Sequence, residues 1–143
     1  MHALIVLRFI AFRLQNEDIE MPNSGDTVLV VEDDALIRWN IVDALEEAGF
    51  EVLEASNVVE AVAILGAVPH IKAVFTDVDM PGPKDGLDLA QVVSSDRPHV
   101  KILVASGHHR PANNDLPAES RFFAKPYSCA NVIASLHEML SAA

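Results

Sequence analysis

The 143-residue chain has a single cysteine, Cys129, and few basic side chains. One cysteine excludes an intramolecular disulfide framework and a metal site built from several thiolates, so Cys129 is expected to be a small, buried or half-buried residue. Ten lysines and arginines stand against 21 acids, which gives a formal net charge of −11. Because such an acidic surface repels phosphate backbones, direct binding of nucleic acid is not expected.

A long apolar run is also missing. The most apolar stretch, residues 1–14, is interrupted by Arg8 and Arg13 and is shorter than the about 20 residues of a membrane span. It also lacks the basic start and the cleavage site of a secretory signal. Residues 1–26 are therefore interpreted as an apolar extension with a polar linker, ahead of one domain over residues 27–143. Three interpretations of the extension stay open: a helix that packs on the domain or a partner, a weak membrane-surface helix, or a stretch outside the natural protein, with Met21 as its start.

After the linker, short apolar runs alternate with helical patterns, which indicates βαβ units and a parallel sheet. Strands are predicted over residues 27–31, 51–55, 73–76, 100–105 and 121–124. Helices are predicted over residues 35–48, 57–65, 87–95 and 128–140. Between the fourth and fifth strands, Pro111 and Pro117 interrupt any helix, so a helix there should be short or irregular.

Polar residues follow the predicted strands at the points where they end. In a parallel sheet, these groups converge at the carboxyl edge, where ligands bind. Carboxylates placed so close together must raise their pKa values or hold a cation, and oxygen ligands suit Mg²⁺. A lysine beside them is a point charge that can contact a phosphoryl oxygen, so the simplest chemistry is phosphoryl transfer to a carboxylate. The residues concerned are Glu32, Asp33, Asp77, Ser106 and Lys125.

In this order and at this spacing, the motifs resemble the receiver domain of two-component response regulators over about residues 27–141. The motifs are VLVVED with Glu32 and Asp33, FTDVDMPG with Asp77, LVASG with Ser106, and FFAKPY with Lys125 and Pro126. The resemblance implies a flavodoxin-like, doubly wound α/β fold. Its five-stranded parallel sheet would have the order 2-1-3-4-5, with helices on both faces.

The resemblance also implies the roles of the site residues. Asp77 would accept the phosphoryl group, and Mg²⁺ would be held by Glu32, Asp33, Asp77 and the backbone carbonyl of Asp79. Lys125 would contact the phosphoryl group. The donor would be a sensor histidine kinase or a histidine phosphotransfer protein in a bacterial cytoplasm, and the output a downstream protein effector.

The switch and the docking surface follow from the same resemblance. Ser106 would move toward the phosphoryl group, and Phe122, three residues before the lysine, would turn into the space behind it. As a phenylalanine, this residue should favour the buried rotamer. Trp39 is expected to face outward from the first helix and to contact a partner, or the extension, and Ile133 on the last helix is expected to do the same.

Three departures from the family pattern qualify these expectations. The segment PGPKDG after Asp77 looks one residue longer than usual, and its two prolines should leave it stiff enough to close over the site. The interval from Ser106 to Lys125 looks about three residues shorter, which puts the usual homodimer surface in doubt. With nothing after the last helix, the chain is expected to be a stand-alone receiver without a DNA-binding output domain, or a receiver cut from a larger protein.

Two other functions stay open. A degenerate receiver would bind partners without phosphorylation. A haloacid-dehalogenase-type phosphohydrolase is suggested by the D-x-D of Asp77 and Asp79, although Met-Pro-Gly does not follow that family's pattern. No enzymatic activity beyond self-phosphorylation and autodephosphorylation is expected. The Asp79 side chain could also affect the phosphate lifetime, and the histidines at 108–109 are expected to be solvated loop residues.

Overall fold

The computed structural model of the chain describes residues 25–108, 111 and 115–141. Its five strands form one parallel sheet in the order β2-β1-β3-β4-β5, which confirms the predicted topology. The strands are β1 Thr27–Val31, β2 Glu51–Ala55, β3 Ile71–Asp77, β4 Lys101–Ser106 and β5 Arg121–Ala124. The helices are α2 Ala35–Glu47, α3 Val58–Ala67, α4 Gly86–Asp96 and α5 Cys129–Ser141.

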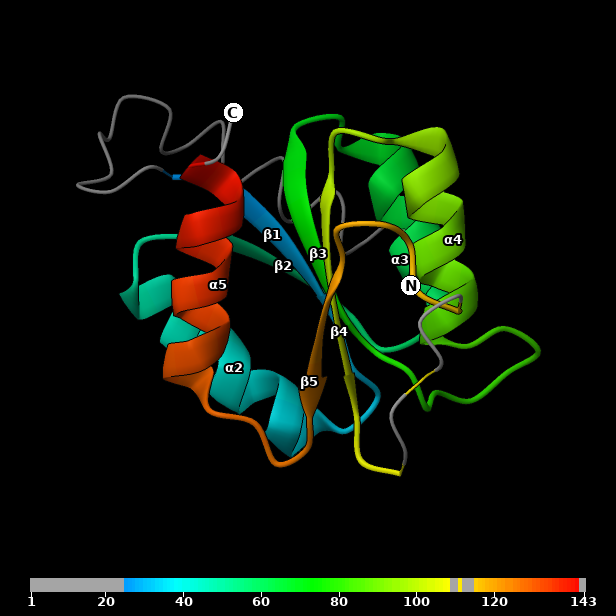
Figure 1. The fold of residues 1–143 in the computed structure, drawn as a ribbon, viewed down its shortest axis with the longest axis horizontal. Helices are drawn as coiled ribbons and strands as arrows, with labels where there is room; N and C mark the ends of the chain where they lie inside the picture. The colour runs from blue at the N-terminus through cyan, green and yellow to red at the C-terminus, as the bar shows by residue number, and fades with distance from the viewer. Residues whose placement is uncertain (1–24, 109–110, 112–114, 142–143) are drawn as a thin grey trace.

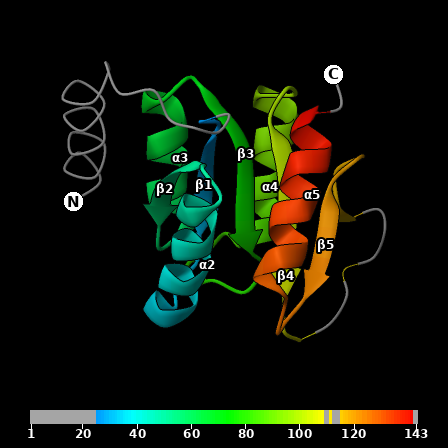
Figure 2. The same ribbon diagram turned by 90° about the vertical axis from the view of Figure 1, so that its left-hand side faces the viewer.

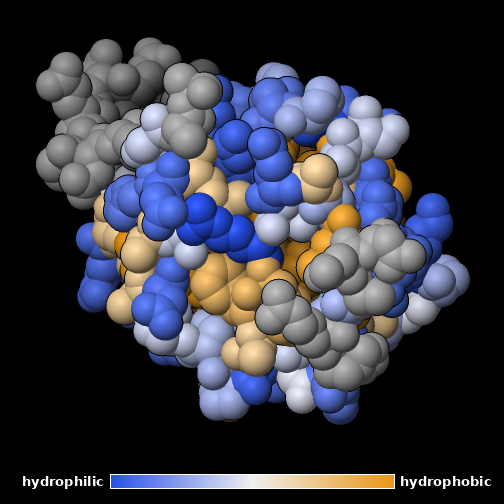
Figure 3. All heavy atoms as spheres, in the orientation of Figure 1, coloured by the Kyte–Doolittle hydropathy of each residue, from blue (hydrophilic) through white to orange (hydrophobic). Residues whose placement is uncertain are grey.

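Helices cover both faces of the sheet, with α2 and α5 on one side and α3 and α4 on the other (Figures 1 and 2). All five residues of β1 are buried, as expected for a β-branched central strand covered on both faces. One core cluster lies under α3 and α4 and includes Leu29 and Leu89. The other lies under α2 and α5 and includes Ile41 and Leu136. On the outer face drawn in Figure 3, hydrophilic residues surround a smaller apolar area.

The register of the sheet brings the ends of the strands into one row. Val31, the last residue of β1, pairs with Thr76 of β3. Asp77 pairs with Ala105, and Ser106 with Ala124. The residues that follow these positions are therefore neighbours across the sheet, and all of them lie at its carboxyl edge.

Local sequence signals set where the helices begin. The Asp34 carboxylate caps α2 by accepting from the backbone N–H groups of Leu36 at 2.9 Å and Ile37 at 3.2 Å. Asp85 begins α4 in a capping box with Asp88. The predicted bounds agree with these helices to within two residues.

The connection from β4 to β5 contains no α-helix among its described residues, which are 107, 108, 111 and 115–120. This agrees with the expected short or irregular helix. Residues 1–24 lie outside the described part of the chain, as does the predicted apolar extension within them. No helix in the described ranges has both the length and the apolar character needed to cross a bilayer.

Two glycines offer a matched test of the packing between β3 and α4. The Gly86 N–H donates to the Val78 carbonyl oxygen at 2.9 Å, and a Cβ at Gly86 would overlap the Asp77 carbonyl group. At Gly66, within α3, an added Cβ meets no atom within 4 Å. We expect Gly86→Ala to lower the free energy of unfolding by about 3 kcal/mol. Gly66→Ala should raise it by about 0.5–1 kcal/mol. Urea unfolding monitored by circular dichroism measures both, and equal stabilities would contradict the close approach at Gly86.

Candidate functional site

Three carboxylates meet at the carboxyl edge of the sheet. Oxygens of Glu32, Asp33 and Asp77 lie within 4.8 Å of one another. Glu32 and Asp77 are buried, whereas Asp33 is exposed. The structure thus brings together the three acidic side chains that the sequence places in the candidate metal site.

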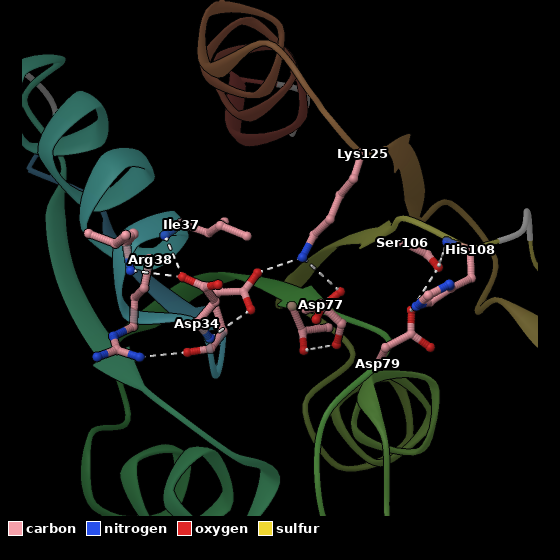
Figure 4. A network of polar contacts seen from close by, with 11 residues as sticks. Asp34, Ile37, Arg38, Asp77, Asp79, Ser106, His108 and Lys125 are labelled. Atoms are coloured by element: carbon pink, nitrogen blue, oxygen red, sulfur yellow. Dashed lines mark hydrogen bonds and ion pairs between the residues drawn. The ribbon is translucent and has the colours of Figure 1, made fainter.

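Lys125 supplies the positive charge of the cluster. Its Nζ lies 2.7 Å from Glu32 Oε1. The same atom lies 3.2 Å from Asp77 Oδ1 (Figure 4). The backbone of Lys125 is anchored as well, because its N–H donates to the Ser106 carbonyl oxygen at 2.9 Å. The backbone pairing between β4 and β5 therefore positions the Lys125 ammonium group beside the acids.

The pKa values of the two buried acids are shifted mainly by burial, and Lys125 only partly offsets this shift. Burial raises the pKa of Glu32, and the nearby Asp77 charge adds to this, while the hydrogen bond from Lys125 opposes it. Burial likewise raises the pKa of Asp77 against the attraction of Lys125, and Asp79 raises it further. Burial alone would lower the pKa of Lys125, but its two acidic neighbours raise it instead. The site therefore favours an additional cation.

The donor set fits Mg²⁺. Asp77 Oδ1 is buried and accepts no hydrogen bond of good geometry from the described residues, and the Lys125 ammonium lies 3.2 Å from it. This leaves a carboxylate oxygen available to a ligand in a cluster made only of oxygen donors, which is the set that Mg²⁺ prefers. Glu32, Asp33 and Asp77 are the side chains that would hold the ion.

Ser106 lies beside the cluster and faces Asp79. Its Oγ donates to Asp79 Oδ2 at 3.1 Å, and the His108 N–H donates to that same Oγ at 3.4 Å. The His108 ring is exposed, and its Nε2 lies 4.0 Å from Asp79 Oδ2. The Asp79 side chain thus takes part in a specific contact instead of facing only solvent.

The remaining predicted residues lie farther out. Phe122 is half-buried and packs against the core cluster under α3 and α4. Trp39 is 58% exposed on α2, where Leu36 is 74% exposed, so its outward direction is as predicted. Ile133, expected to resemble Trp39, is instead half-buried and packs on the core under α2 and α5, so its contact with a partner stays a prediction. Cys129 is half-buried, as expected.

Arg38 is a residue that the sequence reasoning missed. Its Nη1 donates to the Glu32 carbonyl oxygen at 2.7 Å, and its Nε donates to Glu54 Oε1 at 3.1 Å. The side chain is only 16% exposed, so it fixes the loop that carries the acids. An available signal was its place four residues after Asp34, since long helical side chains lean toward the helix N-terminus.

Comparisons with known proteins agree with this geometry. The family model of the response regulator receiver domain matches residues 28–136. The response regulator receiver protein CpdR of Brucella abortus is 32% identical over 119 residues, which cover 81% of this chain and 98% of CpdR. The sensor kinase CckA of the same organism is 35% identical over 118 residues, which cover 80% of this chain but only 12% of that kinase.

Solved structures of receiver domains share the fold of this chain. A response regulator receiver protein from Sinorhizobium medicae superimposes with a TM-score of 0.76 at 28% identity, covering 83% of this chain and 97% of that one. The receiver domain of the hybrid histidine kinase CckA superimposes with a TM-score of 0.68 at 26% identity, covering 80% and 98%.

Fold and site together define a flavodoxin-like signalling domain with an acidic cluster at the carboxyl edge of its sheet. The chain belongs to the response regulator receiver domain family. It is a phosphorylation-dependent switch of two-component signalling.

The raised pKa of Asp77 predicts that its negative charge lowers the stability of the fold at neutral pH. A carboxyl whose pKa is higher in the folded state destabilises the fold as the pH rises through that value. Asp77→Asn should therefore raise the free energy of unfolding by about 1 kcal/mol in magnesium-free buffer at pH 7. The gain should vanish as the pH falls below the ordinary range of a carboxyl.

Magnesium provides the control for this prediction. At ten times its dissociation constant, Mg²⁺ should stabilise the unmodified chain by about 1.4 kcal/mol and the variant by less. Thermal unfolding with and without Mg²⁺ measures both effects. A variant that is less stable than the unmodified chain in magnesium-free buffer would contradict the charge crowding.

Proposed function

We propose that this receiver accepts a phosphoryl group on Asp77, with Mg²⁺ at Glu32, Asp33 and Asp77, from a histidine kinase or a histidine phosphotransfer protein. The observation that carries the proposal is the Asp77 carboxylate: buried, without a hydrogen bond at Oδ1, and 3.2 Å from the Lys125 ammonium. A carboxylate held in this way is available as a nucleophile and has a cation beside it.

The transfer needs little from the protein beyond positioning and charge. An Asp77 carboxylate oxygen attacks phosphorus, the bond from phosphorus to the donor's histidine nitrogen breaks, and its electron pair stays on the imidazole. Glu32, Asp33, Asp77 and the backbone carbonyl of Asp79 would hold Mg²⁺, which would supply positive charge beside the transferred phosphoryl oxygens. Lys125 must turn partly from Glu32 toward the new phosphoryl group, and its reach to both acids places it for that exchange.

The phosphodonor would dock on α2. This helix begins directly after the acidic loop, and its first turns expose Leu36 and Trp39. A large exposed aromatic beside a reaction site is a typical anchor of a protein interface. The names of two relatives, a sensor kinase and a response regulator receiver protein, support a donor of the histidine kinase type.

We further propose that Ser106 and Phe122 form the switch that responds to phosphorylation. The proposal also includes a downstream protein effector, a homodimer and a cytoplasmic location. Phe122, the second residue of β5, is half-buried and packs against the core under α3 and α4, which supports its part in the switch. The boundary between an extension at 1–26 and the receiver at 27–143 also stays a prediction.

Acetyl phosphate tests the chemistry directly. With Mg²⁺, the unmodified chain should gain one phosphoryl group, measured by intact-protein mass spectrometry or Phos-tag electrophoresis. Asp77→Asn should gain none, and chelation of Mg²⁺ should slow labelling at least about 100-fold. Equal labelling of Asp77→Asn would refute the assignment, whereas repeated turnover of small phosphate esters would indicate a phosphohydrolase.

A test of the proposed docking surface on α2 requires a protein as the phosphodonor, because acetyl phosphate is too small to contact that surface. With a phosphorylated histidine phosphotransfer domain that labels the unmodified chain, Trp39→Ala should reduce the transfer rate about tenfold. The same variant should react with acetyl phosphate at an unchanged rate. Val59→Ala is the matched control, because Val59 is 64% exposed on α3 in the opposite helical layer. Equal loss in both variants, or loss with acetyl phosphate, would contradict docking through Trp39.

A further inference from the structure

We infer that the Asp79 side chain is a positioning residue that holds the Ser106 hydroxyl in the unphosphorylated arrangement by competing with the phosphoryl group for its proton. The inference rests on the proposed phosphorylation of Asp77. It concerns the Asp79 carboxylate, whereas the proposed metal contact uses the backbone carbonyl of that residue.

The Ser106 hydroxyl is fully engaged in the structure. Ser106 is 3% exposed, and its Oγ donates to Asp79 Oδ2 at 3.1 Å (Figure 4). The same Oγ accepts from the His108 N–H at 3.4 Å. A serine hydroxyl has one proton to donate, so it cannot serve Asp79 and a second acceptor in full at the same time.

The pairing of β3 with β4 brings Ser106 and Asp79 into contact. Asp77 pairs with Ala105, and the Val78 N–H donates to the Ala105 carbonyl oxygen at 2.9 Å. These bonds hold the end of β3 against the end of β4, so the next side chains, Asp79 and Ser106, meet. Because the Ser106 carbonyl oxygen accepts from the Lys125 N–H at 2.9 Å, the backbone of Ser106 is tied down. Its hydroxyl can therefore change partner mainly by rotation of the side chain.

A phosphoryl group on Asp77 adds strong acceptor oxygens close to this hydroxyl. The Asp79 carboxylate is also a charged acceptor, so it and the phosphoryl group would compete for the Ser106 proton with similar strength. The Ser106 proton can reach the phosphoryl oxygen only after the bond to Asp79 breaks. The negative charge of Asp79 would also repel a phosphoryl group on Asp77 directly, so a test must separate this repulsion from the competition for the Ser106 proton.

A double-mutant cycle makes that separation. The dissociation constant of beryllofluoride, a stable mimic of the phosphoryl group, is measured with Mg²⁺ present by nuclear magnetic resonance titration. The proteins are the full chain, Asp79→Ala, Ser106→Ala and the double variant. We expect Asp79→Ala to tighten binding about tenfold when Ser106 is present and only about twofold when it is absent, a coupling of about fivefold. The amide signals of residues 106–108 report the side-chain change independently of binding strength.

Asp79→Asn separates charge from hydrogen bonding, because its amide oxygen still accepts from Ser106 without a full charge. It should tighten binding less than Asp79→Ala. Equal tightening by Asp79→Ala with and without the Ser106→Ala substitution would overturn the inference and leave only charge repulsion. If Asp79→Ala fails to fold, the same cycle with Asp79→Asn decides, with a smaller coupling expected. Absence of beryllofluoride binding in the unmodified chain would instead refute the proposed function, and the inference with it.

Discussion

The structure depends on an imbalance of charge at one edge of a parallel sheet. Three carboxylates share a space with a single ammonium group, and two of the three are buried. Burial removes the water that would otherwise screen their repulsion, so the pKa values of Glu32 and Asp77 rise. The fold tolerates this cost because the surrounding backbone is held by bonds independent of the acids' charge. A cation or a phosphoryl group with its counterion then changes the local balance strongly, which is what a switch requires.

Those supporting bonds come from several elements. Arg38 of α2 holds the Glu32 carbonyl group, Asp34 caps the same helix, and the ladder from β4 to β5 places Lys125. Each element contributes one part of the site, and no element contains all of it. The geometry of the site is therefore a property of the whole sheet and its register.

Much of this could be predicted from sequence. Buried parallel strands have continuous β-branched runs, and acids or a lysine directly after such runs converge by topology alone, so Asp77 and Lys125 could be placed without a structure. The side-chain partner of Ser106 could not, because its bond to Asp79 depends on how β3 and β4 align at their ends. Arg38 was missed because an arginine on a helix is usually solvated. The half-burial of Ile133 could not be predicted either, because residues at the border of a helix's buried face cannot be assigned from periodicity alone.

The shortness of β5 has a consequence for dynamics. This strand has four residues, pairs only with β4, and has no fully buried residue. Yet the residues within and just after it include Phe122 and Lys125. Edge strands with few buried contacts belong to the parts of a protein that open most easily below global unfolding. A local opening of β5 would remove the ammonium group and the aromatic side chain together, so the assembled site depends on this short edge strand staying paired.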